Sequence, residues 1–187
     1  MNLIVAACEN MGIGIDGKLP WRLKSEMAYF TRMTTRTKDI NKKNVVLMGR
    51  NTWDCIPLKY RPLPNRINVV LSRNSEFKVD DESVLVSDGL DAAVALLSQP
   101  NMRDNIENVW VIGGSHIYKD VMESKYFHRL YLTEILAKFE CDTFMPPLGE
   151  HLTLIEDPEV SADVNEENGI KFIYRVYENS KKWIEKV

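Results

Sequence analysis

The sequence predicts an α/β fold in one domain: a mixed, mainly parallel sheet of about eight strands with helices on both faces. Short, continuous apolar runs rich in Val, Ile and Leu recur along the chain, as is typical of strands buried on both faces of a parallel sheet. Apolar residues at helical spacing lie between several of these runs. This alternation of strand and helix favours right-handed crossovers between parallel strands.

The expected strands and helices follow one another along the first two thirds of the chain. Strands are expected at residues 3–8, 45–48, 67–71, 84–86, 109–112 and 130–136. Helices are expected where Leu23, Met27, Phe30 and Met33 recur, where Leu90, Val94 and Leu97 recur, and over residues 115–124. A further short helix follows Arg50 and ends at Pro57, and Ser87 and Asp88 are candidate N-caps of the helix at Leu90.

The last third of the chain lacks a helical pattern. Residues 152–160 and 170–178 are candidate strands, and the polar stretch SADVNEENG separates them. With no helix between them, an antiparallel hairpin is expected at the end of the sheet. Because no repeat or linker divides the chain, residues 1–187 are expected to form a single domain.

Composition excludes several classes of protein. The 187 residues carry a formal net charge of −3, so no overall basic field attracts nucleic acid or an anionic membrane. The beginning, MNLIVAACEN, lacks the basic region of a signal peptide, and no apolar run approaches the ~20 residues of a membrane span. A cytoplasmic protein that requires neither nucleic acid nor membrane is expected.

Cysteine and histidine spacing argues against a metal centre. Cys8, Cys55 and Cys141 are odd in number, far apart and without a CxxC pair, so three reduced, mostly buried thiols are expected. The histidines show no metal-type spacing either; they are His116, His128 and His151.

Two features near the N-terminus have both a structural and a functional interpretation. Residues 9–21 contain Gly12, Gly14 and Gly17, and such a segment is either a lid beside a ligand crevice or a plain connecting loop. Glu26 then interrupts the apolar stripe of the first helix, beside Met27. It is either a buried functional acid or an exposed first-turn glutamate favoured by the helix dipole.

Three strand ends carry residues suited to phosphate groups. Residues 49–52 (GRNT) and 113–115 (GGS) each follow a strand and open a helix, and residues 72–73 (SR) follow another strand. Helix N-termini and guanidinium groups bind phosphates, and ligands of α/β sheets bind outside the carboxyl ends of the strands. The set predicts a dinucleotide site, although the GxGxxG fingerprint is absent.

Nearly the whole chain resembles dihydrofolate reductases, most closely the eukaryotic ones. The resemblance is carried by LIVAACENMGIGIDGKLPW, MGRNTW, RPLPNRINVVLSR, VWVIGGSHIY, LYLTEI, CDTFMPP and EENGIKFIYRVYEN. It implies reduction of 7,8-dihydrofolate to 5,6,7,8-tetrahydrofolate by hydride transfer from NADPH to C6 and protonation of N5. It further implies a cytoplasmic monomer without a metal, inhibited by antifolates and supporting one-carbon metabolism for thymidylate, purine and glycine synthesis.

The resemblance also implies roles for individual residues around the substrate. Glu26 accepts the N3 and 2-amino donors of the pteridine, and a water reached near Leu19 supplies the proton to N5, with Trp21 and Thr133 ordering the polar network. Arg66 receives the α-carboxylate of the folate tail. The implied substrate-binding residues are Ile4, Val5, Ala6, Glu26, Met27, Phe30, Thr31, Ile56, Tyr60, Leu63, Arg66, Ile112, Tyr118 and Thr133.

For the cofactor, the resemblance places the nicotinamide against Ala6, Ile13 and Tyr118. The pyrophosphate lies between residues 50–52 and 113–115, with a cis peptide at Gly113–Gly114, and the 2′-phosphate lies at residues 72–73. The implied cofactor-binding residues are Ala6, Ile13, Gly14, Ile15, Asp16, Gly17, Lys18, Leu19, Gly49, Arg50, Asn51, Thr52, Leu71, Ser72, Arg73, Asn74, Gly113, Gly114, Ser115, His116, Ile117, Tyr118, Lys119 and Asp120.

The chain departs from the vertebrate pattern at several of these positions. Met27 replaces a phenylalanine of the pteridine wall, and Tyr60 stands where an asparagine bonds the aminobenzoyl carbonyl. Asn51 replaces a lysine and Asp88 an arginine near the phosphates, so a weaker preference for NADPH over NADH is expected. Two alternatives remain: the reductase of riboflavin synthesis on the same fold, and a non-catalytic nucleotide- or RNA-binding protein.

Overall fold

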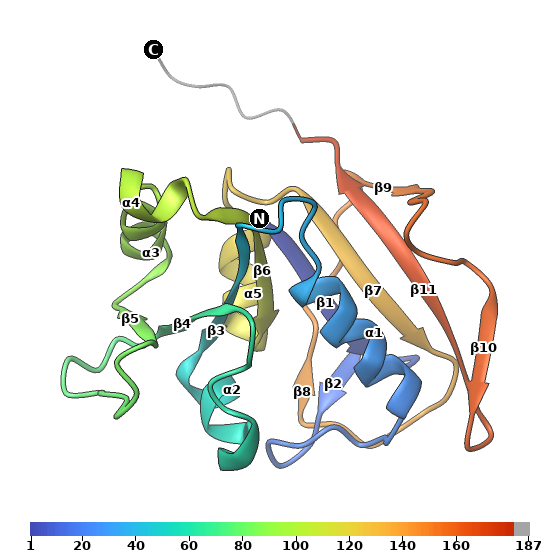
Figure 1. The fold of residues 1–187 in the computed structure, drawn as a ribbon. Coiled ribbons are helices and arrows are strands. Elements are labelled where there is room, and N and C mark those ends of the chain that lie inside the picture. Colours follow the sequence, from blue (N-terminus) through green and yellow to red (C-terminus); the bar gives the residue numbers. More distant parts are fainter. Residues whose placement is uncertain (182–187) are drawn as a thin grey trace.

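A mixed sheet of nine strands runs through the molecule in the computed structural model, which describes residues 1–181 (Figure 1). The predicted domain, residues 1–187, therefore ends in six residues outside the described range. The strand order is β10-β11-β7-β1-β6-β3-β4-β5, and β9 pairs with β11. The strands are β1 (Asn2–Ala7), β3 (Lys43–Gly49), β4 (Ile67–Leu71), β5 (Leu85–Ser87), β6 (Ile106–Gly113), β7 (Arg129–Ile135), β9 (Leu152–Ile155), β10 (Val164–Glu167) and β11 (Ile170–Asn179).

The sheet is parallel from β7 through β1, β6, β3 and β4 to β5, and antiparallel where β11 pairs with β7, β9 and β10. The predicted fold class is therefore confirmed. From β1 the chain first builds the sheet outward through β3, β4 and β5, then returns through β6 and continues on the other side of β1 with β7. The strand order thus reverses around β1, and such a reversal opens a crevice at the carboxyl ends of the strands.

Helices cover both faces of the sheet, as predicted. Alternate residues of β3 show this: Val45 and Leu47 belong to the core beneath α3 and α5, whereas Val46 and Met48 belong to the core beneath α1 and α2. This is the period-two alternation of a strand buried on both sides. The helices are α1 (Lys24–Thr35), α2 (Arg50–Cys55), the short η1 (Leu58–Tyr60), α3 (Leu90–Leu97), α4 (Pro100–Arg103) and α5 (Ser115–Met122).

The C-terminal hairpin differs from its prediction. β11 forms a hairpin with β10, which lies inside the stretch expected to be a loop, while β9 pairs with the other end of β11. Asn168 and Gly169 form the turn with φ angles of 53° and 74°, the left-handed pair that two-residue hairpins favour. The pattern of apolar residues in the sequence could not reveal β10, because an edge strand obtains its stability from backbone pairing and needs few apolar side chains.

The glycine-rich segment is not a plain loop. Its strand β2 (Gly12–Gly14) pairs with β8 (Thr143–Phe144) in a separate two-stranded sheet. Beyond β2, Ile15 and Lys18 exchange two backbone hydrogen bonds of 2.9 Å around a tight turn. The backbone N–H of Asp16 also donates to the Asp142 carboxylate at 2.8 Å. The segment is therefore attached to the chain around β8 along much of its length.

Two smaller predictions are wrong. The N-cap of α3 is Gly89, without a side-chain cap; the Ser87 hydroxyl instead donates to the Gly89 carbonyl at 3.2 Å, and Asp88 is exposed. The cysteines are free, but only Cys8 is buried: Cys141 is partly exposed and Cys55 is exposed at the end of α2. Within residues 1–181, no helix is long and apolar enough to cross a membrane.

Candidate active site

The strand ends that carry the candidate ligand-binding residues meet at one edge of the sheet, the lower edge in Figure 1. Gly49 at the end of β3 lies opposite Leu71 at the end of β4, and Met48 lies opposite Gly113 at the end of β6. On the other side of β6, Ala6 of β1 lies opposite Thr133 of β7. The three phosphate-type segments of the sequence therefore converge at the carboxyl edge of the sheet.

Glu26 is buried beside this edge. It lies in the first turn of α1, its side chain is only 6% exposed, and its Oε1 accepts a hydrogen bond of 3.2 Å from the hydroxyl of Thr133, which is completely buried. Burial raises the pKa of Glu26 to about 7, and the hydrogen bond from Thr133 opposes that rise. The alternative of an exposed first-turn glutamate is wrong.

Two aromatic site candidates, Tyr118 and Trp21, are both buried but differ in their hydrogen bonding. The hydroxyl of Tyr118 donates to the Ile4 carbonyl at 2.8 Å, and burial, followed by the charge of Glu26, raises the pKa of Tyr118. Trp21 is 6% exposed and packs edge-on against Phe139, but its indole N–H has no acceptor among residues 1–181. A buried N–H of this kind needs an acceptor from solvent or from a ligand.

The predicted apolar wall is largely present on the α1 face of the sheet. Members of one core cluster are Ile4, Phe30, Ile56, Leu63 and Ile112. Two predicted wall residues are placed differently. The Val5 side chain points to the opposite face, because neighbouring residues of a strand alternate, and Met27 is 47% exposed. The side chains of Val5 and Met27 are therefore not part of the apolar cluster on the α1 face.

The remaining candidates around the substrate and the nicotinamide are exposed or partly buried. Thr31 is exposed on α1, Leu19 is 45% exposed in the glycine-rich segment, and Tyr60 is 55% exposed with the Lys59 ammonium 4.6 Å from its ring centroid. Ala6 and Ile13 are partly buried near the ends of β1 and within β2. Thr31, Leu19 and Tyr60 are thus exposed, whereas Ile13 and Ala6 pack against two of the core clusters.

Arg66 is a buried cation without an acidic partner. It is 8% exposed; its Nε donates to the Pro64 carbonyl at 3.0 Å and its Nη1 to the Thr34 hydroxyl at 2.7 Å. Within the described range, no carboxylate forms an ion pair with it, and burial lowers its pKa. Since a guanidinium has five N–H donors, most of this fork is still available to an anion.

The turn between β6 and α5 lies close to α2. A Cβ at Gly113 or Gly114 would lie 3.1 or 3.3 Å from the Thr52 hydroxyl, so glycine at both positions permits this approach. The Gly113–Gly114 peptide is cis, as predicted, and Gly113 has a φ of 129°. On the other side, Ile117 of α5 packs against Gly49. The structure thus joins the two predicted pyrophosphate segments into one surface.

The cations of this surface are exposed and unpaired. Arg50 and Arg73 are exposed, and neither forms an ion pair within residues 1–181. The Ser72 hydroxyl accepts the backbone N–H of Asn74 at 3.2 Å, whereas the Ser115 hydroxyl donates to the Phe144 carbonyl at 2.6 Å. The other cofactor candidates are exposed or partly buried around this edge, except Leu71, whose side chain is in the core; they are Gly14, Ile15, Asp16, Gly17, Lys18, Asn51, His116, Lys119 and Asp120.

The sequence analysis missed two residues that hold candidate site residues in place, Thr34 and Asp142. Thr34 is completely buried, donates to the Phe30 carbonyl at 2.8 Å and accepts from Arg66. Asp142 holds the backbone of Asp16. A hydroxyl in the last turn of an amphipathic helix was a faint signal for Thr34, since polar residues on a buried face need partners. No local signal pointed from Asp142 to a segment so far away in sequence.

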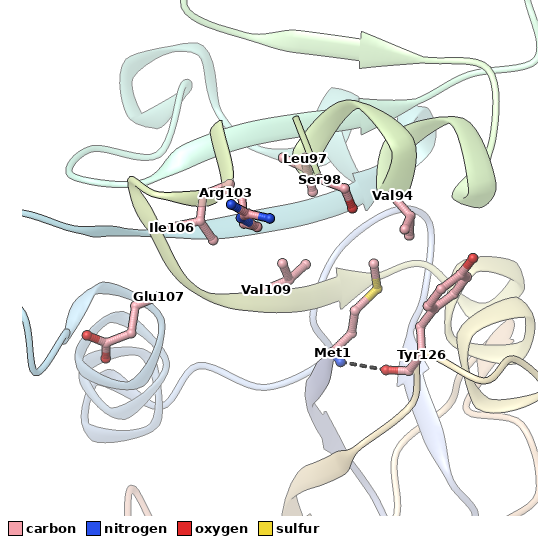
Figure 2. Close-up of a pocket in the computed structure, with 9 residues that line it drawn as sticks. All are labelled: Met1, Val94, Leu97, Ser98, Arg103, Ile106, Glu107, Val109 and Tyr126. Carbon is pink, nitrogen blue, oxygen red and sulfur yellow. Dashed lines mark hydrogen bonds between the residues drawn. The ribbon is translucent and has the colours of Figure 1, made fainter. Parts of the chain in front are cut away.

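A cavity of about 300 Å³ lies away from this site (Figure 2). It is lined by Met1, by Leu97 of α3, by Arg103 of α4 and by Val109 of β6. These residues are near the amino ends of the parallel strands, at the edge opposite Glu26. None of the predicted site residues lines it.

Known proteins of similar sequence and structure share one description. A family model for dihydrofolate reductase matches residues 1–179. The dihydrofolate reductase of Heliothis virescens is 47% identical over 180 residues, 95% of this chain and 96% of the relative, and that of Gallus gallus is 45% identical over 183 residues, 96% of each. The Schistosoma mansoni dihydrofolate reductase structure superposes with a TM-score of 0.84 at 37% identity, covering 95% of this chain and 97% of that one.

Proposed function

The chain belongs to the dihydrofolate reductase family, and on that premise we propose that Glu26 and Arg66 hold dihydrofolate while the neighbouring strand ends hold NADPH. The reaction reduces 7,8-dihydrofolate to 5,6,7,8-tetrahydrofolate by adding a hydride at C6 and a proton at N5. The observation that carries the assignment of residues is the burial of Glu26 at the carboxyl edge of the sheet.

Glu26 binds the donor edge of the pteridine ring. N3 and the 2-amino group present two parallel N–H donors, and a carboxylate accepts both. Such charge-assisted hydrogen bonds contribute roughly 1.5–3 kcal/mol each. Since burial disfavours the ionised form of Glu26, the two donors stabilise a charge that the protein alone leaves poorly solvated. The carboxylate thereby orients the ring so that C6 and N5 lie at its far side.

Delivery of the proton to N5 involves Trp21, Thr133 and Leu19. The Thr133 hydroxyl orients the carboxylate of Glu26, and the Trp21 indole N–H positions a water or a substrate atom beside it. Leu19, exposed in the glycine-rich segment, controls access of water to N5. Glu26 is at the wrong end of the ring to protonate N5 directly. General acid catalysis of this kind is typically worth about 10²–10⁴-fold.

NADPH, when bound, supplies the hydride. The residues at the strand ends fit it: Thr52 and the Gly113–Gly114 turn form a surface that a Cβ would obstruct. Arg50 lies at the beginning of α2, where a cation and free N–H groups suit the pyrophosphate. Arg73 and Ser72 hold the 2′-phosphate that distinguishes NADPH from NADH. Ala6, Ile13 and Tyr118 border the place of the nicotinamide.

Arg66 receives the α-carboxylate of the glutamate tail. Its Nη1 is fixed by Thr34, so the guanidinium is oriented before the anion arrives. Ile56 and Leu63 flank the aminobenzoyl ring, and Tyr60 is at the rim of the same region. The remaining properties that we propose are a monomer in the cytoplasm, with free thiols in its resting state and a role in one-carbon metabolism.

A direct assay tests the proposal. Protein, NADPH and dihydrofolate are mixed, and the nicotinamide absorbance is followed with and without a 2,4-diaminopyrimidine antifolate. We expect oxidation of NADPH that depends on dihydrofolate and inhibition competitive with dihydrofolate, because the protonated diaminopyrimidine offers Glu26 the same pair of donors. Inhibition that is not competitive would refute the pocket assignment. Nothing in the comparisons favours the riboflavin-synthesis reductase or a non-catalytic binding protein.

A further inference from the structure

Two thiols from distant parts of the chain meet at the base of the glycine-rich segment. Cys8 directly follows β1 and Cys141 lies shortly before β8, yet their Sγ atoms are 3.8 Å apart across a sequence separation of 133. Gly12 leaves room for them: a Cβ there would collide with the Cys141 sulfur and lie 3.0 Å from the Cys8 sulfur. The fold therefore holds two sulfurs in contact beside β2.

We propose that Cys8 and Cys141 form a thiol–disulfide site that closes by exchange with a small-molecule disulfide and thereby restrains the glycine-rich segment. Cys141 is partly exposed and Cys8 is buried, so Cys141 reacts first. Its thiolate attacks the reagent disulfide RSSR, forming a mixed disulfide and releasing RS⁻. The Cys8 thiolate then attacks the Cys141 sulfur and releases the second RS⁻. The two thiols lose two electrons and two protons, which the reagent takes up as two RSH.

The resting pair is held as thiols. The Cys8 thiol donates to the Asn10 side-chain oxygen at 3.0 Å, and burial, together with the hydrogen bond to Cys8, raises the pKa of Cys141. Because the thiolate is the attacking species, exchange is slow and needs an excess of oxidant. The sulfurs must also approach to the bond length of about 2.05 Å. These features give a site that stays reduced until the thiol–disulfide balance of its surroundings changes.

Formation of the disulfide would act on the glycine-rich segment, whose Leu19 is proposed above to control access of water to N5, so this inference rests on the proposed function. Cys141 is followed by Asp142, which holds the Asp16 backbone, and by β8, which pairs with β2. Cys8, Cys141 and Trp21 also belong to one apolar cluster. Drawing Cys141 toward the end of β1 therefore shifts the chain that anchors residues 12–18 and the packing around Trp21.

Thiol counting tests the chemistry. A Cys55→Ser background removes the exposed third thiol, and the reduced protein should show two titratable thiols after unfolding. After incubation with oxidised glutathione, we expect none, an intact mass lower by two hydrogen atoms, and a Cys8–Cys141 cross-linked peptide. Single Cys8→Ser and Cys141→Ser variants in this background should show no such cross-link. Two thiols that stay free, or that each carry glutathione, would overturn the proposal.

Turnover and amide exchange test the consequence. The reduced Cys55→Ser protein must first reduce dihydrofolate; if it does not, the proposed function fails whatever the thiols do. After oxidation we expect kcat to fall by about tenfold to 10²-fold, the scale of a ~1 Å displacement near a reacting centre, and to recover with dithiothreitol. Amide exchange of residues 12–18 should slow. A variant with serine at all three cysteines should keep its kcat in oxidised glutathione. A disulfide that changes neither kcat nor exchange would refute the restraint.

Discussion

The proposed substrate half and the proposed nucleotide half of the crevice differ in where their charges lie. Glu26 and Arg66 are buried and each is held by a threonine, whereas Arg50 and Arg73 are exposed and unpaired within residues 1–181. A charge removed from water costs stability until a partner binds it, while an exposed charge costs almost nothing. Removing a buried charge from the substrate half should therefore lower activity but raise the stability of the folded protein. Removing an exposed charge from the nucleotide half should lower activity without changing stability.

The largest effect is expected from removing the acid of the substrate half. Glu26→Ala should lower kcat/KM for dihydrofolate by about 10²–10⁴-fold near neutral pH, since two charge-assisted hydrogen bonds of ~1.5–3 kcal/mol are lost. Affinity for NADPH, measured by fluorescence titration, should change little, because the proposed cofactor site lies in the other half. Unchanged turnover would remove Glu26 from the mechanism.

The same acid should destabilise the folded protein at higher pH. Its pKa is raised from 4.5 to about 7, so the folded state binds the proton more tightly. The free energy of unfolding therefore falls as the pH rises from 4.5 to about 7. Above pH ~7 the total loss is about 3 kcal/mol. Glu26→Gln should therefore raise the free energy of unfolding in urea at pH ~8. The same substitution should give a gain about 2 kcal/mol smaller at pH ~5.5. The exposed Glu166→Gln is the matched control; an equal gain at both pH values would contradict the burial of Glu26.

Arg66 should separate binding from chemistry. Arg66→Gln loses the fork for the tail carboxylate, so KM for dihydrofolate should rise by roughly 10²-fold with a small change in kcat. A dihydropterin without the glutamyl tail provides the control, because its kcat/KM should be the same in both proteins. If the variant slowed the truncated substrate equally, Arg66 would act on the structure and not on the tail.

In the nucleotide half, Arg73→Gln should raise KM for NADPH by about tenfold and leave KM for NADH unchanged, as expected for one exposed phosphate contact. Urea unfolding should be unaltered, in contrast to Glu26→Gln. Arg103→Gln, at an exposed arginine outside the crevice, should change neither KM. Parallel losses for both cofactors would place Arg73 away from the 2′-phosphate.

The smallest effect concerns Asp88, which is exposed. The wild-type ratio of kcat/KM for NADPH over NADH should be below that of vertebrate enzymes, because Asp88 and Asn51 replace cations. Asp88→Arg should raise the ratio by about twofold to fivefold, the range of an exposed charge interaction. A wild-type ratio equal to the vertebrate one would refute this expectation.

The sequence predicted the parallel part of the fold well, because strands buried on both faces leave continuous apolar runs. It failed for β10, which is held by its backbone against β11 and leaves no apolar pattern. In the site, residue types and strand ends were predictable, but burial was not. Thr133, the hydrogen-bond partner of Glu26, is 107 positions away, and Thr34, the partner of Arg66, is 32 positions away, so no local pattern linked them. The side of the sheet taken by Val5 required the register of β1.

Helix α1 has a consequence beyond its packing. It carries Glu26 in its first turn and, in its last turn, the Thr34 that orients Arg66. Eight positions of α-helix span about 12 Å, and no glycine or proline interrupts them. On the proposed assignment of residues, the helix would therefore act as a molecular ruler between the head and the tail of the substrate. A dihydropterin whose carboxylate sits on a much shorter spacer should engage one end of the ruler and miss the other.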